Sequence, residues 1–140
     1  MKPIPDTENA PVLRTDFSDQ AAWKEVCAEI QRPVSIFRFI AYVDFIDDVQ
    51  YATLTKDQLL KLLPSHYNHS FIIVVDSATL SNPEHPLLVI DLFDDAHQEF
   101  RALPSQIQSI ENNLSIGNMD VEDFTSALDS DGVFRGFSPF

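Results

Sequence analysis

Five consecutive apolar residues, Phe71-Ile72-Ile73-Val74-Val75, decide the fold class of this sequence. The run has the length of a strand and is rich in β-branched residues. A strand without polar alternation is typical of a parallel sheet covered on both faces. Two helical patterns and two further strands precede it, which predicts a βαβαβ arrangement with parallel strands at its centre.

The two earlier strands are predicted at residues 11–14 and 36–45, and the second is dense in aromatic and β-branched residues. Two patterns predict the helices that separate the three strands. The first helix follows a cap at Ser18 or Asp19 and carries an apolar stripe at helical spacing, formed by Trp23, Val26, Cys27 and Ile30. The second begins at Thr55 and Gln58, which have capping-box spacing, and ends near Pro64.

The pattern changes in the last third of the chain. Strands are predicted at residues 87–93 and 99–103, and so short a connection requires antiparallel pairing. Helices are predicted to open at Pro104 and at Asp120, and the apolar tail is expected to dock on the body. We therefore expect one α/β domain over residues 11–140, with a mixed sheet of about five strands and about four helices. Residues 1–10 are expected to form a flexible polar arm.

The charge of the chain narrows its partners. The 140 residues include 22 Asp and Glu against 9 Lys and Arg, a formal net charge of −13. Such a surface repels nucleic-acid phosphates and anionic lipids, so we expect neither nucleic acid nor a membrane surface as a partner. Basic proteins, cations and neutral small molecules remain.

Cysteine content and targeting signals favour a cytoplasmic protein. Cys27 is the single cysteine, so no internal disulfide forms, and its place on a buried stripe favours packing over nucleophilic chemistry. The first residues lack the apolar stretch of a signal peptide, and the longest apolar runs fall far short of the ~20 residues of a membrane helix.

Acidic residues follow the strands that are predicted to be parallel. Ligands usually bind beyond the carboxyl ends of such strands, which makes Asp16, Asp44 and Asp76 candidate ligand-binding residues. Asp47 and Asp48 follow close behind Asp44. Clustered carboxylates suit Mg²⁺ or Ca²⁺, whereas the alternative is that these residues only cap helices and stabilise turns.

A polar stretch at the end of a predicted helix supplies three further candidates, Asn112, Asn113 and Asn118. Their amides are able to bind a ligand at the strand-end rim, and the alternative is a helix-helix corner that uses them in its turns. His85 precedes the fourth strand, and a carboxylate beside it would make it a candidate general base. A loop histidine without a catalytic role is the other interpretation.

Known metal, cofactor and hydrolase motifs are missing from the sequence. Asp129-Ser130-Asp131-Gly132 resembles part of a calcium loop, but alignment on Gly132 puts Ala127 and Ser138 at the terminal ligand positions. No histidine and cysteine set has zinc spacing, and neither a phosphate-binding glycine loop nor a Gly-x-Ser-x-Gly motif is present. We therefore predict no cofactor and assign no metal ligand.

Several blocks resemble a small domain family of unknown function whose members are found in actinobacteria and fungi. They are Leu13-Arg14-Thr15-Asp16-Phe17-Ser18 followed by Trp23, residues 85–92, Glu111-Asn112-Asn113-Leu114-Ser115-Ile116 with Asn118-Met119-Asp120, and residues 131–137. The resemblance covers nearly the whole chain after the arm and supports a single domain. It assigns no catalytic role to any residue.

The charge imbalance and the missing catalytic motifs favour a binding or accessory protein whose acidic surface engages a basic protein partner. The alternative is a small enzyme or small-molecule-binding domain that uses the acidic strand-end rim, with or without a divalent cation. The two hypotheses differ in geometry, because only the second requires a concave pocket at the strand ends.

Overall fold

A six-stranded mixed sheet runs through the computed structural model, which describes residues 2–137. The strands are β1 (Ala10–Arg14), β2 (Val43–Ile46), β3 (Phe71–Val75), β4 (Leu87–Asp91), β5 (Glu99–Ala102) and β6 (Val133–Phe134), in the order β2-β1-β3-β4-β5-β6. β1 pairs in parallel with both β2 and β3, which confirms the predicted βαβαβ unit. β4 pairs antiparallel with β3 and β5, which confirms the predicted hairpin.

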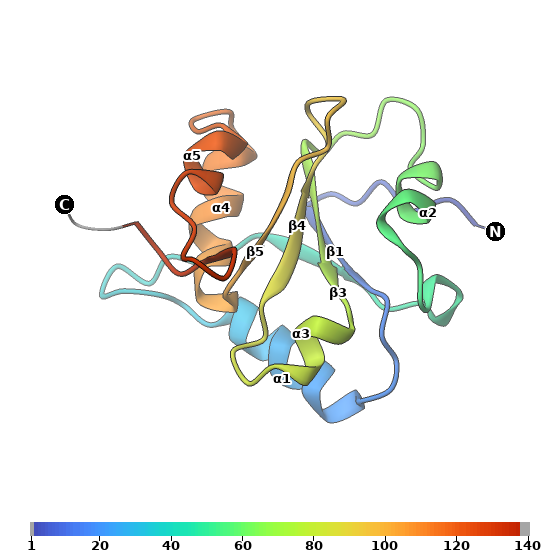
Figure 1. Cartoon of the computed structure of the whole chain (residues 1–140), viewed down its shortest axis with the longest axis horizontal. Helices are drawn as coiled ribbons and strands as arrows, with labels where there is room; N and C mark the ends of the chain where they lie inside the picture. The colour runs from blue at the N-terminus through green and yellow to red at the C-terminus, as the bar shows by residue number, and fades with distance from the viewer. Residues whose placement is uncertain (1, 138–140) are drawn as a thin grey trace.

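Helices cover both faces of the sheet (Figure 1). They are α1 (Gln20–Gln31), α2 (Lys56–Lys61), α3 (Ser77–Ser81), α4 (Ile107–Leu114) and α5 (Val121–Thr125), with the single 3-10 turns η1 (Val49–Tyr51) and η2 (Pro104–Gln106). α1, α3, α4 and α5 pack on one face around Trp23, Ile73 and Phe124. On the other face, α2 and η1 pack around Tyr51, Leu59 and Ile72. The alternate residues of β3 therefore point into two different cores, as its unbroken apolar sequence predicts.

The local signals that begin α1 and α2 are confirmed, whereas Pro104 begins the 3-10 turn η2 and α4 starts only at Ile107. Asp19 caps α1 by accepting a hydrogen bond from the backbone N–H of Ala22. Thr55 and Gln58 form the capping box of α2. The apolar tail docks as predicted, but it does so partly as a strand, because β6 pairs in parallel with β5.

The strand order places a topological switch point between β1 and β3. α1 connects β1 to β2 on one face of the sheet, and α2 connects β2 to β3 on the opposite face. From the carboxyl end of β1 the chain continues to β2 on one side, and from the carboxyl end of its neighbour β3 it continues to β4 on the other side. The gap between these two connections is the usual place for a ligand in an open α/β sheet.

The strand predicted at residues 36–45 is wrong over most of its length. β2 begins only at Val43, because β1 begins at its register partner Ala10 and offers no backbone to pair with earlier residues. Residues 34–42, which we call the exposed hairpin, instead form a short loop that is closed by an antiparallel bridge between Val34 and Phe39. Four of its side chains, those of Ile36, Phe37, Phe39 and Tyr42, are at least half exposed, with Ile36 89% and Phe37 73% exposed. Apolar density alone did not distinguish a covered strand from an exposed loop.

The residues expected to form a flexible arm lie against the body. The Ile4 side chain is fully buried in the core beneath α2, and its backbone N–H donates to the Leu62 carbonyl at 2.9 Å. The Tyr51 hydroxyl donates to the Pro3 carbonyl at 2.7 Å. The buried Ile4 side chain and hydrogen bonds from Tyr51 and Tyr67 thus anchor the segment, and a lone isoleucine is too weak a signal to be recognised from the sequence.

Candidate ligand site at the strand ends

A buried arginine organises the loop that follows β1. Arg14 is 2% exposed, and its Nε donates to the Asp16 carbonyl at 2.8 Å while its Nη1 donates to Gln20 at 2.8 Å and to Asp47 at 3.3 Å. The guanidinium lies over the Phe17 ring, 4.3 Å from its centroid. Buried guanidinium groups require such partners, and these partners fix the loop between β1 and α1.

In this loop, the Asp16 side chain points toward Ser18. Asp16 Oδ1 accepts from the backbone N–H of Ser18 at 2.8 Å and from the Ser18 hydroxyl at 2.6 Å. Asp16 forms no ion pair with a lysine or arginine of residues 2–137, and within that range its Oδ2 accepts no hydrogen bond from protein. One oxygen of an unneutralised carboxylate is therefore free to accept a hydrogen bond.

Thr15, which precedes Asp16, connects the end of β1 to the end of β3 and to the loop after η1. Its backbone N–H donates to the Val75 carbonyl at the end of β3 at 2.9 Å, and its own carbonyl accepts from the Thr53 N–H at 2.7 Å. Thr53 has a φ of 61°, a left-handed conformation that non-glycine residues seldom adopt. The loop that follows η1 is thereby closed over the ends of β1 and β3.

Asp76, the first residue after β3, has two structural roles: it caps a helix and forms an ion pair. It caps α3 by accepting from the Thr79 N–H at 3.1 Å, and Arg101 of β5 donates to its two oxygens at 2.7 and 2.8 Å. Burial on its own would raise the pKa of Asp76, but the hydrogen bonds and charge of Arg101, with those of Thr79, outweigh it and lower that pKa. Asp76 is thus ionised at pH 7 and paired with Arg101, whereas Asp16 forms no ion pair with a lysine or arginine among residues 2–137.

A cavity of about 560 Å³ lies at the junction of these loops. It is lined by Thr15, Asp16, Phe17, Ser18, Ala52, Thr53, Leu54, Asp76 and Ser77. These residues follow β1, η1 and β3, so the cavity lies at the topological switch point. Two of the six residues predicted to bind a ligand, Asp16 and Asp76, are therefore brought together at the strand ends.

Asp44 lies elsewhere. It is the second residue of β2, opposite Pro11 near the beginning of β1, and it accepts from the Asn9 backbone N–H at 2.8 Å. The predicted strand began at residue 36 instead of Val43, which placed Asp44 near its carboxyl end. The residue that follows β2 is Asp47, which contacts Arg14.

The three asparagines do not line the strand-end cavity either. Asn113 donates from its side chain to the Ser109 carbonyl at 2.7 Å, and Asn118 donates to the Asn113 side chain at 2.8 Å. Asn112 donates to the Ile40 carbonyl at 3.2 Å at the base of the exposed hairpin. A second cavity, of about 370 Å³ between Ser70 and Val121, is lined by none of them. The geometry is that of the helix-helix corner considered as the alternative.

The structure explains two other features of the sequence, the single cysteine and the stretch that resembles a calcium loop. Cys27 packs against the core, and burial raises the pKa of its thiol to about 11, so the thiol is protonated at neutral pH. Asp129 and Asp131 both pair with Arg135, at 2.8 and 2.7 Å, which satisfies the carboxylates of the stretch that resembled a calcium loop.

The structure also brings together three residues that no sequence pattern connects. His85 contacts Glu29 of α1, with 3.0 Å between Nδ1 and Oε1, and not an aspartate that follows a strand. Glu25 lies one turn earlier on α1 and completes a group of three possible metal ligands. The pair of glutamates four residues apart was visible in the sequence, but no local signal connects it to a histidine 56 residues away.

Comparison with known proteins gives the family. The model of a family described as Domain of unknown function (DUF6924) matches residues 9–137. The chain belongs to this family. The expected resemblance to a domain family of unknown function is thus confirmed, and the match extends from the residue before β1 through β6. No curated protein matches the sequence. Within residues 2–137, no helix is long and apolar enough to cross a membrane.

Proposed function

We propose that the protein binds a small hydroxylated amine in the strand-end cavity. The observation that supports this proposal best is the free Oδ2 of Asp16. Among residues 2–137, this carboxylate forms no ion pair with a lysine or arginine. Its two acidic neighbours differ, because Asp47 contacts Arg14 and Asp76 pairs with Arg101. An ammonium group would supply the missing positive charge and hydrogen-bond donor.

The rest of the cavity favours hydroxyl groups on the ligand. Thr15, Ser18, Thr53 and Ser77 line it, and the ring of Phe17 provides an apolar wall. The hydroxyls of Thr15, Ser18 and Thr53 donate within the protein, so their oxygens are left to accept hydrogen bonds from the hydroxyls of a ligand. The location at the switch point between β1 and β3 is where open α/β sheets commonly bind small molecules.

Glucosamine and glucose are matched probes, because they differ only in that glucosamine carries an amino group where glucose carries a hydroxyl. At ten times its dissociation constant, glucosamine is expected to stabilise the fold by about 1.4 kcal/mol, which raises Tm by about 4 °C. Asp16→Asn should abolish this shift. Asp95→Asn, which removes one charge from an exposed loop, should preserve it. Equal shifts with glucose, or an unchanged shift in Asp16→Asn, would contradict the proposal.

The exposed hairpin supports a second function, the binding of a protein partner. Ile36, Phe37, Phe39 and Tyr42 are all at least half exposed, and the Phe37 and Phe39 rings lie 5.9 Å apart. A cluster of exposed aromatic residues beside Arg38 has the composition of interface hot spots. The net charge of −13 supports the predicted basic partner, but residues 31–43 carry two arginines and no acidic residue, so acidic groups outside the hairpin would supply the attraction.

A comparison of two baits tests this second function. Proteins that bind the wild-type chain through the hairpin should be lost from the double variant Ile36→Ser, Phe37→Ser, which changes only solvent-exposed side chains. If charge steers a basic partner, its retention should also fall at high salt. Partners retained equally by both baits would exclude the hairpin, and partners retained equally at both salt concentrations would exclude the electrostatic contribution.

A further inference from the structure

His85, Glu25 and Glu29 form a cluster that is separate from the strand-end cavity. One ligand atom of each residue lies within 4.8 Å of the other two. The ligands of one tetrahedral Zn²⁺ ion are roughly 3.3–3.6 Å apart, given metal-to-ligand bonds of roughly 2.0–2.2 Å. Small side-chain rotations would therefore bring the three atoms onto one ion.

The histidine is the rigid member of the cluster. His85 is 6% exposed and lies in the loop between α3 and β4, where its backbone N–H donates to the Asn82 carbonyl at 2.9 Å. The Asn82 side chain in turn accepts from the Glu84 N–H at 2.9 Å. This turn places the imidazole against α1, beside the face that carries both glutamates.

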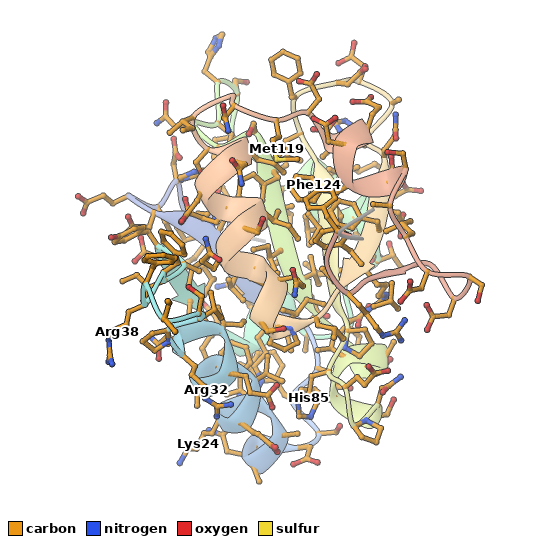
Figure 2. The ribbon with its side chains drawn as sticks, turned by 90° about the vertical axis from the view of Figure 1, so that its left-hand side faces the viewer. Lys24, Arg32, Arg38, His85, Met119 and Phe124 are labelled. Atoms are coloured by element: carbon orange, nitrogen blue, oxygen red, sulfur yellow. The ribbon has the colours of Figure 1, made fainter. Side chains whose placement is uncertain are left out.

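The two glutamates lack a compensating cation. They lie one turn apart on α1, where like charges destabilise a helix. Among residues 2–137, neither glutamate forms an ion pair with a lysine or arginine, and the one charge partner is His85 if it is protonated. Lys24 extends from α1 on the side away from His85 (Figure 2). A divalent cation would neutralise both carboxylates at once.

The choice of cation follows from the donor atoms. Mg²⁺ and Ca²⁺ prefer oxygen ligands alone, whereas imidazole favours first-row transition ions such as Zn²⁺. A cavity of about 360 Å³ borders the cluster and is lined by Glu25, His85, Asp19 and Asn82, among others. Three protein ligands beside an open cavity leave one coordination position for water or another small ligand.

We propose that Glu25, Glu29 and His85 bind a divalent first-row transition metal ion, with Zn²⁺ as the representative, and leave one coordination position open. The site shares no lining residue with the strand-end cavity, so this proposal can be tested independently of the proposed amine binding. Its position joins the middle of α1 to the loop before β4. Metal binding would therefore cross-link these two segments and stabilise the fold.

Calorimetry of the chelator-treated full chain with Zn²⁺ alone, and with Mg²⁺ alone, tests the site. We expect one Zn²⁺ per chain, no comparable Mg²⁺ binding, and visible d–d absorption when Co²⁺ replaces Zn²⁺. Glu29→Gln and His85→Gln should each weaken Zn²⁺ binding at least tenfold, comparable to the loss of a ligand's supporting interactions. Glu25→Gln, at an exposed position, provides a ligand variant that leaves the buried contacts intact.

Glu8→Gln and His66→Gln are the matched controls, because both residues are exposed and lie outside the cluster. They should bind Zn²⁺ like the wild type. No saturable one-to-one binding would overturn the proposal. Binding that survives in Glu25→Gln and Glu29→Gln but falls in His66→Gln would assign the metal to a surface histidine and would overturn it equally.

Discussion

Polar side chains gather at the strand ends after β1 and β3 and at the corner after α4, but they are used differently in the two regions. At the corner, Asn113 and Asn118 direct their amides to backbone and to each other. At the strand ends, Asp16 uses one oxygen for Ser18 and leaves the other available. The difference shows that a polar cluster indicates a ligand site only when its groups are not consumed by the local turn.

The two regions also differ in what supports them. The loop at the strand ends depends on Arg14, a buried charge whose partners come from three segments. At the corner, the side chains of Asn113 and Asn118 form hydrogen bonds with residues at most five positions away. A disturbance at the strand ends should therefore spread through the fold, whereas one at the corner should remain local.

Arg14→Ala is expected to have the largest effect on stability. It removes three hydrogen bonds and the contact with Phe17 from a buried position, which should cost about 3 kcal/mol of the free energy of unfolding. Asn118→Ala at the exposed corner is the control and should cost about 0.5 kcal/mol. Urea denaturation measures both. Equal losses in the two variants would remove the distinction between the regions.

Asp76→Asn should have a smaller effect that depends on pH. The pKa of Asp76 is lowered in the folded chain, so ionisation of this residue stabilises the fold at pH values above its unfolded pKa of about 3.9. That stabilisation is lost as the pH falls through the lower, folded pKa. We expect a loss of about 1 kcal/mol at pH 7 from the weaker contact with Arg101.

The same comparison at lower pH tests the sign. As the pH falls below about 3.9, the difference in unfolding free energy between Asp76→Asn and the wild type should shrink, because the wild-type carboxylate becomes protonated too. Urea denaturation at both ends of this range gives the two differences. A difference that is constant with pH would show that charge at Asp76 contributes nothing to stability.

Much of the fold could be predicted from sequence because its signals are local. The spacing of Trp23, Val26 and Ile30 and the capping box at Thr55 each specify a helix within a few residues. The boundary of β2 could not be predicted in this way, since it depends on where β1 begins to offer pairing partners. That one error also moved Asp44 to the wrong end of its strand.

The candidate sites show the same division. Asp16 and Asp76 follow parallel strands directly, so topology alone brings them to one cavity. The contact of Glu29 with His85 depends on how α1 packs beside the loop before β4, which no local pattern encodes. Asn112 to Asn118 were ambiguous because asparagine suits turns and ligands equally well, and only the hydrogen-bond geometry distinguishes the two.

Amide chemical-shift mapping with glucosamine tests the difference between the two regions most directly. We expect saturable shifts confined to the loops that contain Asp16, Thr53 and Ser77, and the loss of these shifts in Asp16→Asn. Shifts centred on Asn112 to Asp120, or shifts that persist unchanged in Asp16→Asn, would contradict this expectation.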